Sequence, residues 1–166
     1  AFYDCTGLES IVLPEGVTSI GADAFRSCSG LVSVTLPQTL TTIGKTAFDE
    51  CIKLASISIP ENVRNIDTYA FWNCSGLISI DVSEDNEVFD SRNNCNALIE
   101  TSSNTLVRGC FRTIIPDDVK RIDNYAFSCC YGLVSIAIPS GVESIGSCAF
   151  WASRNLSSVT SFGIEA

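Results

Sequence analysis

Residues 31–53, LVSVTLPQTLTTIGKTAFDECIK, decide the fold because near copies of this stretch lie on both sides of it. The proline six positions after the first leucine and the Ala-Phe pair near the end recur at the same interval of 23 residues. A fixed period in this range is typical of a solenoid, in which each repeat forms one turn and neighbouring turns share a core. The leucines that open the copies are Leu8, Leu31, Leu54, Leu77, Leu133 and Leu156.

Within one copy, the apolar positions predict how the chain turns. Ile11 and Leu13 alternate with Ser10, which is a strand pattern with the apolar side chains facing inward. The proline that follows ends this strand, and the next apolar pair predicts a second short extended arm or a turn. The Ala-Phe segment is too short for an independent helix, so we expect a single helical or 3₁₀ turn with the phenylalanine buried. The resulting aromatic spine comprises Phe25, Phe48, Phe71, Phe127 and Phe150.

The period breaks between Leu77 and Leu133, where the chain is ten residues longer than two regular copies. Residues 81–94 are polar and acidic and predict a loop, whereas residues 97–107 predict a hairpin that turns at Ser102-Ser103. We expect two enlarged rungs with a hairpin insertion at about 81–112, inside a single domain that spans residues 1–166. Residues 1–7 match the tail of a copy, so a longer parent protein is expected. Residues 162–166 depart from the repeat pattern at Phe162 and predict either a terminating strand or the boundary of an excised fragment.

Composition narrows the possible functions. Apolar residues make up 46% of the chain and charged residues 17%, which predicts a folded protein. A net charge of −9 opposes binding to nucleic acid and to anionic membrane surfaces. No apolar run approaches the ~20 residues of a membrane span, so no direct membrane insertion is expected. The chain has no histidine, no serine beside a base, no phosphate-binding loop and no cysteine pair with zinc spacing. These absences predict no catalytic activity and no cofactor.

Five of the nine cysteines occupy one repeat position and predict a column of buried, reduced thiols, although neighbouring rungs lie close enough for pairing. These are Cys5, Cys28, Cys51, Cys74 and Cys130. Cys95 and Cys110 lie off this column. A two-residue turn at Ser102-Ser103 places them opposite each other across the hairpin, either as a disulfide or as adjacent thiols. Cys129 and Cys148 are expected to be isolated thiols.

The repeat L-x-x-I-x-L-P-x-x-V-x-x-I-G-x-x-A-F-x-x-C resembles the BspA-like class of leucine-rich repeats, and the match covers nearly the whole chain. The resemblance implies a right-handed leucine-rich repeat solenoid with a parallel sheet along one side and short helical or 3₁₀ turns on the other. It also implies a place on the cell surface or among the secreted proteins of host-associated microbes. Proteins of this class are linked to adhesion, so the implied partners are host matrix or cell-surface proteins and other microbial cells. The family supplies no catalytic residues and no fixed binding motif.

Three groups of residues are candidate sites, each with a simpler alternative. The insertion could bind Ca²⁺ through its carboxylates. Because it lacks EF-hand spacing, a solvated loop is the simpler alternative. The outer face of the first strands could bind protein, or its small side chains could serve only to stack. Trp72 and Trp151 could form an exposed binding patch or pack against the next rung, and packing is favoured. The calcium candidates are Asp81, Glu84, Asp85, Glu87 and Asp90, and the outer-face candidates are Ser33, Thr35, Ser56, Ser58, Ser79 and Asp81.

Two functional hypotheses follow from the repeat and the resemblance. The first is a non-catalytic protein-binding or adhesion module of a cell-surface or secreted protein. The second is a structural spacer within a large surface protein, without a ligand of its own.

Overall fold

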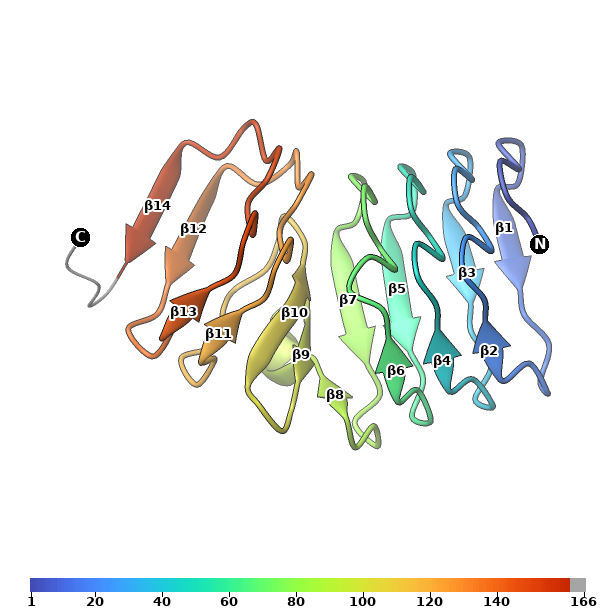
Figure 1. Cartoon of the computed structure of the whole chain (residues 1–166), viewed down its shortest axis with the longest axis horizontal. Coiled ribbons are helices and arrows are strands. Elements are labelled where there is room, and N and C mark those ends of the chain that lie inside the picture. The colour runs from blue at the N-terminus through green and yellow to red at the C-terminus, as the bar shows by residue number, and fades with distance from the viewer. Residues whose placement is uncertain (162–166) are drawn as a thin grey trace.

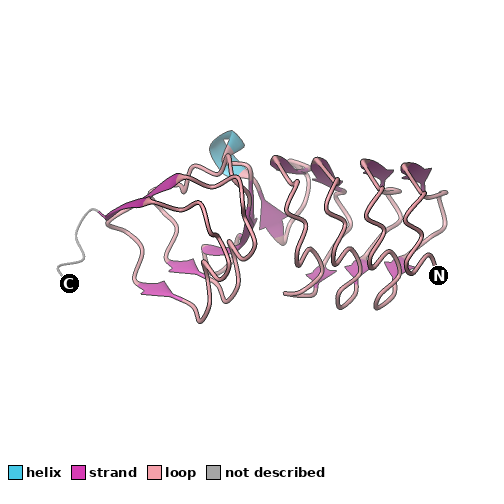
Figure 2. Ribbon diagram, turned by 90° about the horizontal axis from the view of Figure 1, so that it is seen from above, coloured by secondary structure: helices cyan, strands magenta, loops and turns pink. Residues whose placement is uncertain are grey.

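The computed structural model describes residues 1–161, which wind into an elongated stack of turns (Figure 1). Each turn of the first half carries one short strand on each of two opposite sides (Figure 2). The first half contains β1 (Ser10–Val12), β2 (Ser19–Ile20), β3 (Ser33–Thr35), β4 (Thr42–Ile43), β5 (Ser56–Ile59), β6 (Asn65–Ile66) and β7 (Ser79–Val82). The remainder contains β8 (Phe89–Asp90), the 3₁₀ helix η1 (Arg92–Asn94), β9 (Ala97–Glu100), β10 (Thr105–Gly109), β11 (Arg121–Ile122), β12 (Ser135–Ile138), β13 (Ser144–Ile145) and β14 (Ser158–Ser161).

Register between the strands follows the sequence period. On the first side, β1 pairs with β3, β5 with β7 and β12 with β14, all in parallel. Ser56 lies opposite Ser79, and Ile57 lies opposite Ile80, so equivalent residues stack from rung to rung. The serines of β5 are exposed and its isoleucines are buried, as the alternation predicted. The leucine-rich repeat solenoid is therefore confirmed.

The second arm of each rung forms a sheet of its own, which the sequence left open as an arm or a turn. Strands β2, β4 and β6 form a parallel sheet in which Ile20, Ile43 and Ile66 are register partners. Parallel sheets therefore line both sides of the first half, rather than one side only. Such short strands still form a sheet because hydrogen bonds between neighbouring rungs flank each of them, as from Gly44 to the Ile20 carbonyl and from Asp67 to the Ile43 carbonyl.

The Ala-Phe corner consists of single turns without a helix. Ala24 donates a backbone hydrogen bond to the Gly21 carbonyl at 3.3 Å, which closes one turn. The next N–H, on Phe25, donates instead to the Ala47 carbonyl of the following rung at 2.8 Å. Ser27 has a positive φ of 60°, which a continuing helix would not allow. The expected turn is present, and the 3₁₀ helix η1 of the insertion is the one helix within residues 1–161.

The phenylalanine spine and the cysteine column lie side by side in the core. The rings of Phe25 and Phe48 stack with centroids 5.2 Å apart, and those of Phe48 and Phe71 at 5.5 Å. Cys51 and Cys74 are free, buried thiols, and the Cys74 Sγ donates to the Phe48 carbonyl at 3.0 Å. The same Phe48 carbonyl also accepts the N–H of Cys51 at 3.1 Å, so the thiol adds a second hydrogen bond to a buried carbonyl.

The insertion forms a partition across the solenoid. Strands β8, β9 and β10 are antiparallel, and β10 continues in parallel into β11 and then β13. Both faces of the hairpin are buried: Ala97 and Ile99 pack into the C-terminal core cluster, whereas Leu98 packs into the N-terminal one. The predicted hairpin is confirmed, but its position between two cores was not predicted.

Arg108, on the second hairpin strand, joins this partition to the next rung. Its side chain is 5% exposed and donates to the carbonyls of Tyr125 and Ser128, each at 3.1 Å. The neighbouring N–H of Gly109 donates to Ala126 at 2.9 Å. At Asp49, the repeat equivalent of Ser128, the carbonyl accepts the backbone N–H of Ser27 in the preceding rung. At Ser128 the guanidinium of Arg108 therefore replaces a missing backbone donor. A Cβ at Gly109 would overlap the ring of Phe127, so this position requires glycine.

Candidate functional site

The outer face of the first sheet is exposed along the N-terminal half. Ser33, Thr35, Ser56 and Ser58 are exposed, and Ser79 is half-buried. Their hydroxyl groups form a flat face that can donate and accept hydrogen bonds along several rungs. This face carries no aromatic side chain, so it lacks the large anchors that dominate many interfaces. Asp81, at the end of the row, adds one exposed carboxylate.

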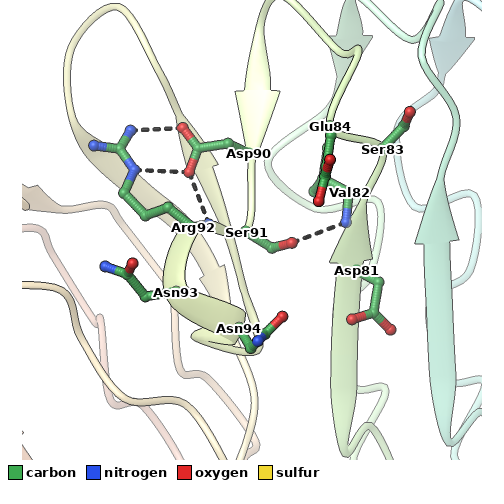
Figure 3. A pocket seen from close by; sticks show the side chains of 9 residues that line it. All are labelled: Asp81, Val82, Ser83, Glu84, Asp90, Ser91, Arg92, Asn93 and Asn94. Carbon is green, nitrogen blue, oxygen red and sulfur yellow. Dashed lines mark hydrogen bonds and ion pairs between the residues drawn. The ribbon is translucent and has the colours of Figure 1, made fainter.

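A polar cleft of about 460 Å³ opens where the first sheet is interrupted after β7 (Figure 3). The Ser91 hydroxyl accepts a hydrogen bond from the Val82 N–H at 3.0 Å and so caps part of the free strand edge. Such capping limits further strand addition at this edge. The cleft is lined by Asp81, Val82, Ser83, Glu84, Asp90, Ser91, Arg92, Asn93 and Asn94.

Arg92 organises the wall of this cleft. Its guanidinium binds Asp90 through two hydrogen bonds of 2.7 and 2.6 Å (Figure 3). It also donates to Asn104 at 2.7 Å and to Asp118 at 2.5 Å. Burial alone would raise the pKa of Asp90, but the hydrogen bonds from Arg92 outweigh it and lower the pKa below its usual value. Arg92 therefore holds β8, the hairpin and the following rung together.

The calcium candidates of the insertion, for which a solvated loop was the alternative, have separate partners in the structure. Asp90 is committed to Arg92, and Glu87 pairs with Arg64 at 3.2 Å. Asp81 and Glu84 line the cleft, whereas Asp85 is exposed on its loop. No group of three or more acidic, cysteine or histidine residues within 1–161 is arranged to hold a metal ion. The closely spaced acids lie on a turn and two separate strands, so they face different partners.

Of the two alternatives for Cys95 and Cys110, a disulfide or adjacent thiols, the structure has free thiols. The hairpin register matches the prediction at Leu106, which lies opposite Ile99, but a bulge then shifts the pairing by one residue. Since side chains alternate between faces, this shift moves Cys110 away from the position opposite Cys95. Cys110 packs in the N-terminal core cluster and Cys95 in the C-terminal one. Of the two remaining off-column cysteines, Cys129 is a buried free thiol and Cys148 an exposed one.

Trp72 and Trp151 meet in an aromatic cluster at one corner of the solenoid. Trp72 stacks on Tyr69 at 4.9 Å and on Tyr125 at 5.2 Å between ring centroids. Trp151 meets Trp72 edge to face at 6.2 Å, yet 51% of Trp151 remains exposed. The favoured packing interpretation holds for Trp72, which is half-buried, whereas Trp151 is largely presented to solvent. The cluster joins rungs that the insertion separates in sequence.

Several polar residues with structural roles carried no signal in the repeat pattern. Asn86 is buried, donates to the Pro60 carbonyl at 2.7 Å and accepts the N–H of Phe89 at 2.9 Å. Arg92 and Asp118 are 26 residues apart and meet only because the insertion folds back. A buried asparagine or a paired arginine in an irregular segment resembles any solvated loop residue in the sequence. These contacts therefore could not be found from spacing.

Six copies of the BspA type leucine rich repeat region match residues 1–112 and 110–162. The chain therefore belongs to the BspA-type leucine-rich repeat family. No curated protein sequence matches the chain. No helix within residues 1–161 has the length and apolar character to cross a bilayer.

Solved structures of three bacterial proteins share this fold. A leucine rich cell surface protein from Faecalibacterium prausnitzii A2-165 is 35% identical, with a TM-score of 0.79 over 96% of this chain and 43% of that protein. A leucine-rich repeat protein from Bacteroides ovatus is 30% identical, with a TM-score of 0.57 over 96% of this chain and 33% of that protein. The pneumococcal vaccine antigen PcpA is 23% identical, with a TM-score of 0.77 over 95% of this chain and 40% of that protein, which shows the fold alone. The chain spans less than half the length of each.

Proposed function

We propose that this chain is a non-catalytic protein-binding and adhesion module of a cell-surface or secreted leucine-rich repeat protein. The observation that carries the proposal is the largely exposed outer face of the β1–β3 and β5–β7 strand pairs, formed by equivalent residues on successive rungs. A flat array of this kind suits an extended protein partner better than a small molecule, which needs a concave pocket. Membership of a family with cell-surface relatives supports the same role.

The test is a solid-phase binding panel of host matrix proteins and partner cells with the purified chain. The variant Thr35→Glu/Ser58→Glu places two charges on the exposed face without touching the core. Glu143→Gln, an exposed change on the second side, is the matched control. We expect binding that the double variant loses and the control retains. Absence of binding to every panel member at micromolar concentration would contradict the proposal.

A structural spacer is the second candidate, because the outer face offers small hydroxyl side chains and no aromatic anchor. Deleting residues 31–53 removes one whole rung and joins equivalent repeat positions. In the parent protein, a spacer would tolerate the deletion of residues 31–53 and the deletion of residues 54–76 equally well. A binding module would lose activity with the rungs that carry its site.

A further inference from the structure

The corner that carries the aromatic cluster continues as a groove along the first half of the solenoid. Phe2 stacks on Phe25 at 5.2 Å and so extends the phenylalanine spine. Two residues after each of these phenylalanines the chain adopts a positive φ, as at Asp4 (58°), Glu50 (61°) and Asn73 (57°). This shared conformation stacks equivalent side chains along the corner. The groove has a volume of about 460 Å³, and its walls include Asp4, Ser27, Glu50, Asn73, Ser75 and Tyr131.

The groove carries uncompensated negative charge. Asp23 and Asp49 flank Arg26 at 3.5 and 3.2 Å, so this cation is already shared by two carboxylates. Glu50 accepts a hydrogen bond from Ser27 at 2.8 Å, and neither Glu50 nor Asp4 belongs to an ion pair within residues 1–161. The molecule as a whole has a net charge of −9, which favours the approach of a cationic partner.

The aromatic cluster lies on the adjoining row of the same corner. Trp72 directly precedes Asn73 of the groove, and its carbonyl accepts the Glu50 N–H at 3.0 Å. Tyr131 lines the groove together with Asp4 and Glu50 and is 38% exposed. Trp151 contacts Trp72 on the adjoining row and is 51% exposed, so phenol and indole surface remains free along this corner. Aromatic faces attract lysine and arginine side chains, and exposed tryptophan and tyrosine often anchor protein interfaces.

We propose that this acidic-aromatic corner docks an extended, lysine- or arginine-rich segment of a partner protein. Charge complementarity selects the occupant: the carboxylates of Asp4 and Glu50 attract the cations, and Trp151 and Tyr131 receive them on their rings. The inference rests on the proposed protein-binding function and adds a contact on the corner to the one on the sheet face. It also names the chemistry of the partner.

The probe is a fluorescent twelve-residue peptide of alternating lysine and glycine, titrated by anisotropy, with the serine-glycine peptide as a neutral comparison. We expect binding of the basic peptide only, weakening as salt increases. Trp151→Ala should weaken it about two- to fivefold, the range for an exposed cation–π contact. Asp4→Asn/Glu50→Gln should weaken it further and flatten the salt dependence. Thr35→Glu, on the sheet face, is the control and should not weaken it.

Three results would overturn the inference: equal binding of both peptides, no binding of the basic peptide, or unchanged affinity in both corner variants. A neutral β-linked oligosaccharide is a further probe. If it binds, if Trp151→Ala abolishes this binding, and if the basic peptide does not bind, then the corner recognises glycans and the inference is refuted. The proposed function is judged separately by the matrix panel. If the corner variants still bind matrix proteins and Thr35→Glu/Ser58→Glu does not, the proposed function is supported and the inference about the corner is refuted.

Discussion

Replacing Phe48 by alanine removes the centre of the phenylalanine stack. Phe48 is fully buried and has a ring partner on each side, Phe25 at 5.2 Å and Phe71 at 5.5 Å. A buried Phe→Ala change costs ~3–5 kcal/mol, and the loss of two stacked partners places this site at the upper end. Phe150 is half-buried and stacks on Phe127 at 5.1 Å. Since its burial is smaller, we expect Phe150→Ala to cost about 2 kcal/mol.

The free energy of unfolding of each variant can be measured by urea denaturation, followed by circular dichroism and tryptophan fluorescence. Small domains have only ~5–15 kcal/mol of stability, so Phe48→Ala risks complete unfolding. Phe48→Leu keeps most of the volume and should cost about 1.5 kcal/mol, which gives a second measurement on a folded protein. The reasoning is refuted if Phe48→Ala costs no more than Phe150→Ala. An interior ring must lose contacts to two neighbouring rungs in any one-dimensional stack.

Three further predictions concern polar and thiol groups. Arg108→Met should destabilise the protein by about 2 kcal/mol in the same denaturation assay, because the buried carbonyl and hydroxyl oxygens of Ser128 lose their donors and the removal of a buried cation only partly offsets this; a stabilised variant would contradict it. With a thiol reagent at pH 8, the exposed Cys148 should react in the native state. Cys74 should react only after the protein unfolds, because burial raises the pKa of its thiol to about 12; labelling of both cysteines at the same rate would contradict the packed column. At pH 7, Asp90→Asn should cost about 1–2 kcal/mol, discounted for partial exposure. Because the folded-state pKa of Asp90 is lowered, this contribution is fully present above the unfolded pKa of about 3.9 and is lost as pH falls through the folded value. The cost of the substitution should therefore shrink below about pH 4, and a constant difference down to pH 2.5 would refute the pairing with Arg92.

The expectation that residues 162–166 form a terminating strand or a boundary concerns a segment outside the described residues. Strand β14 ends at Ser161 and keeps the regular register, with Ser158 opposite Ser135 and Ser161 opposite Ile138. The repeat pattern is therefore followed to the end of the described chain.

The sequence by itself determined the solenoid, the inward and outward faces of its strands, and the stacking of its phenylalanines and cysteines. Residues such as Phe25, Phe48 and Phe71 repeat at a constant interval, and equivalent positions on successive turns meet the same surroundings. One repeat therefore predicts the contacts of the others. The hairpin turn was also readable, because a turn depends on a few adjacent residues.

Tertiary structure alone decided what happens where the period fails. One bulged residue in the hairpin separates Cys110 from Cys95, and no local pattern marks a bulge of this kind. The insertion also sets which rungs become neighbours across it, and so brings Trp72 against Tyr125 and Arg108 against Ser128. These pairs are not separated by a multiple of the repeat. Their meeting depends on how the partition packs between two cores, which is a property of the assembled fold and not of any one segment.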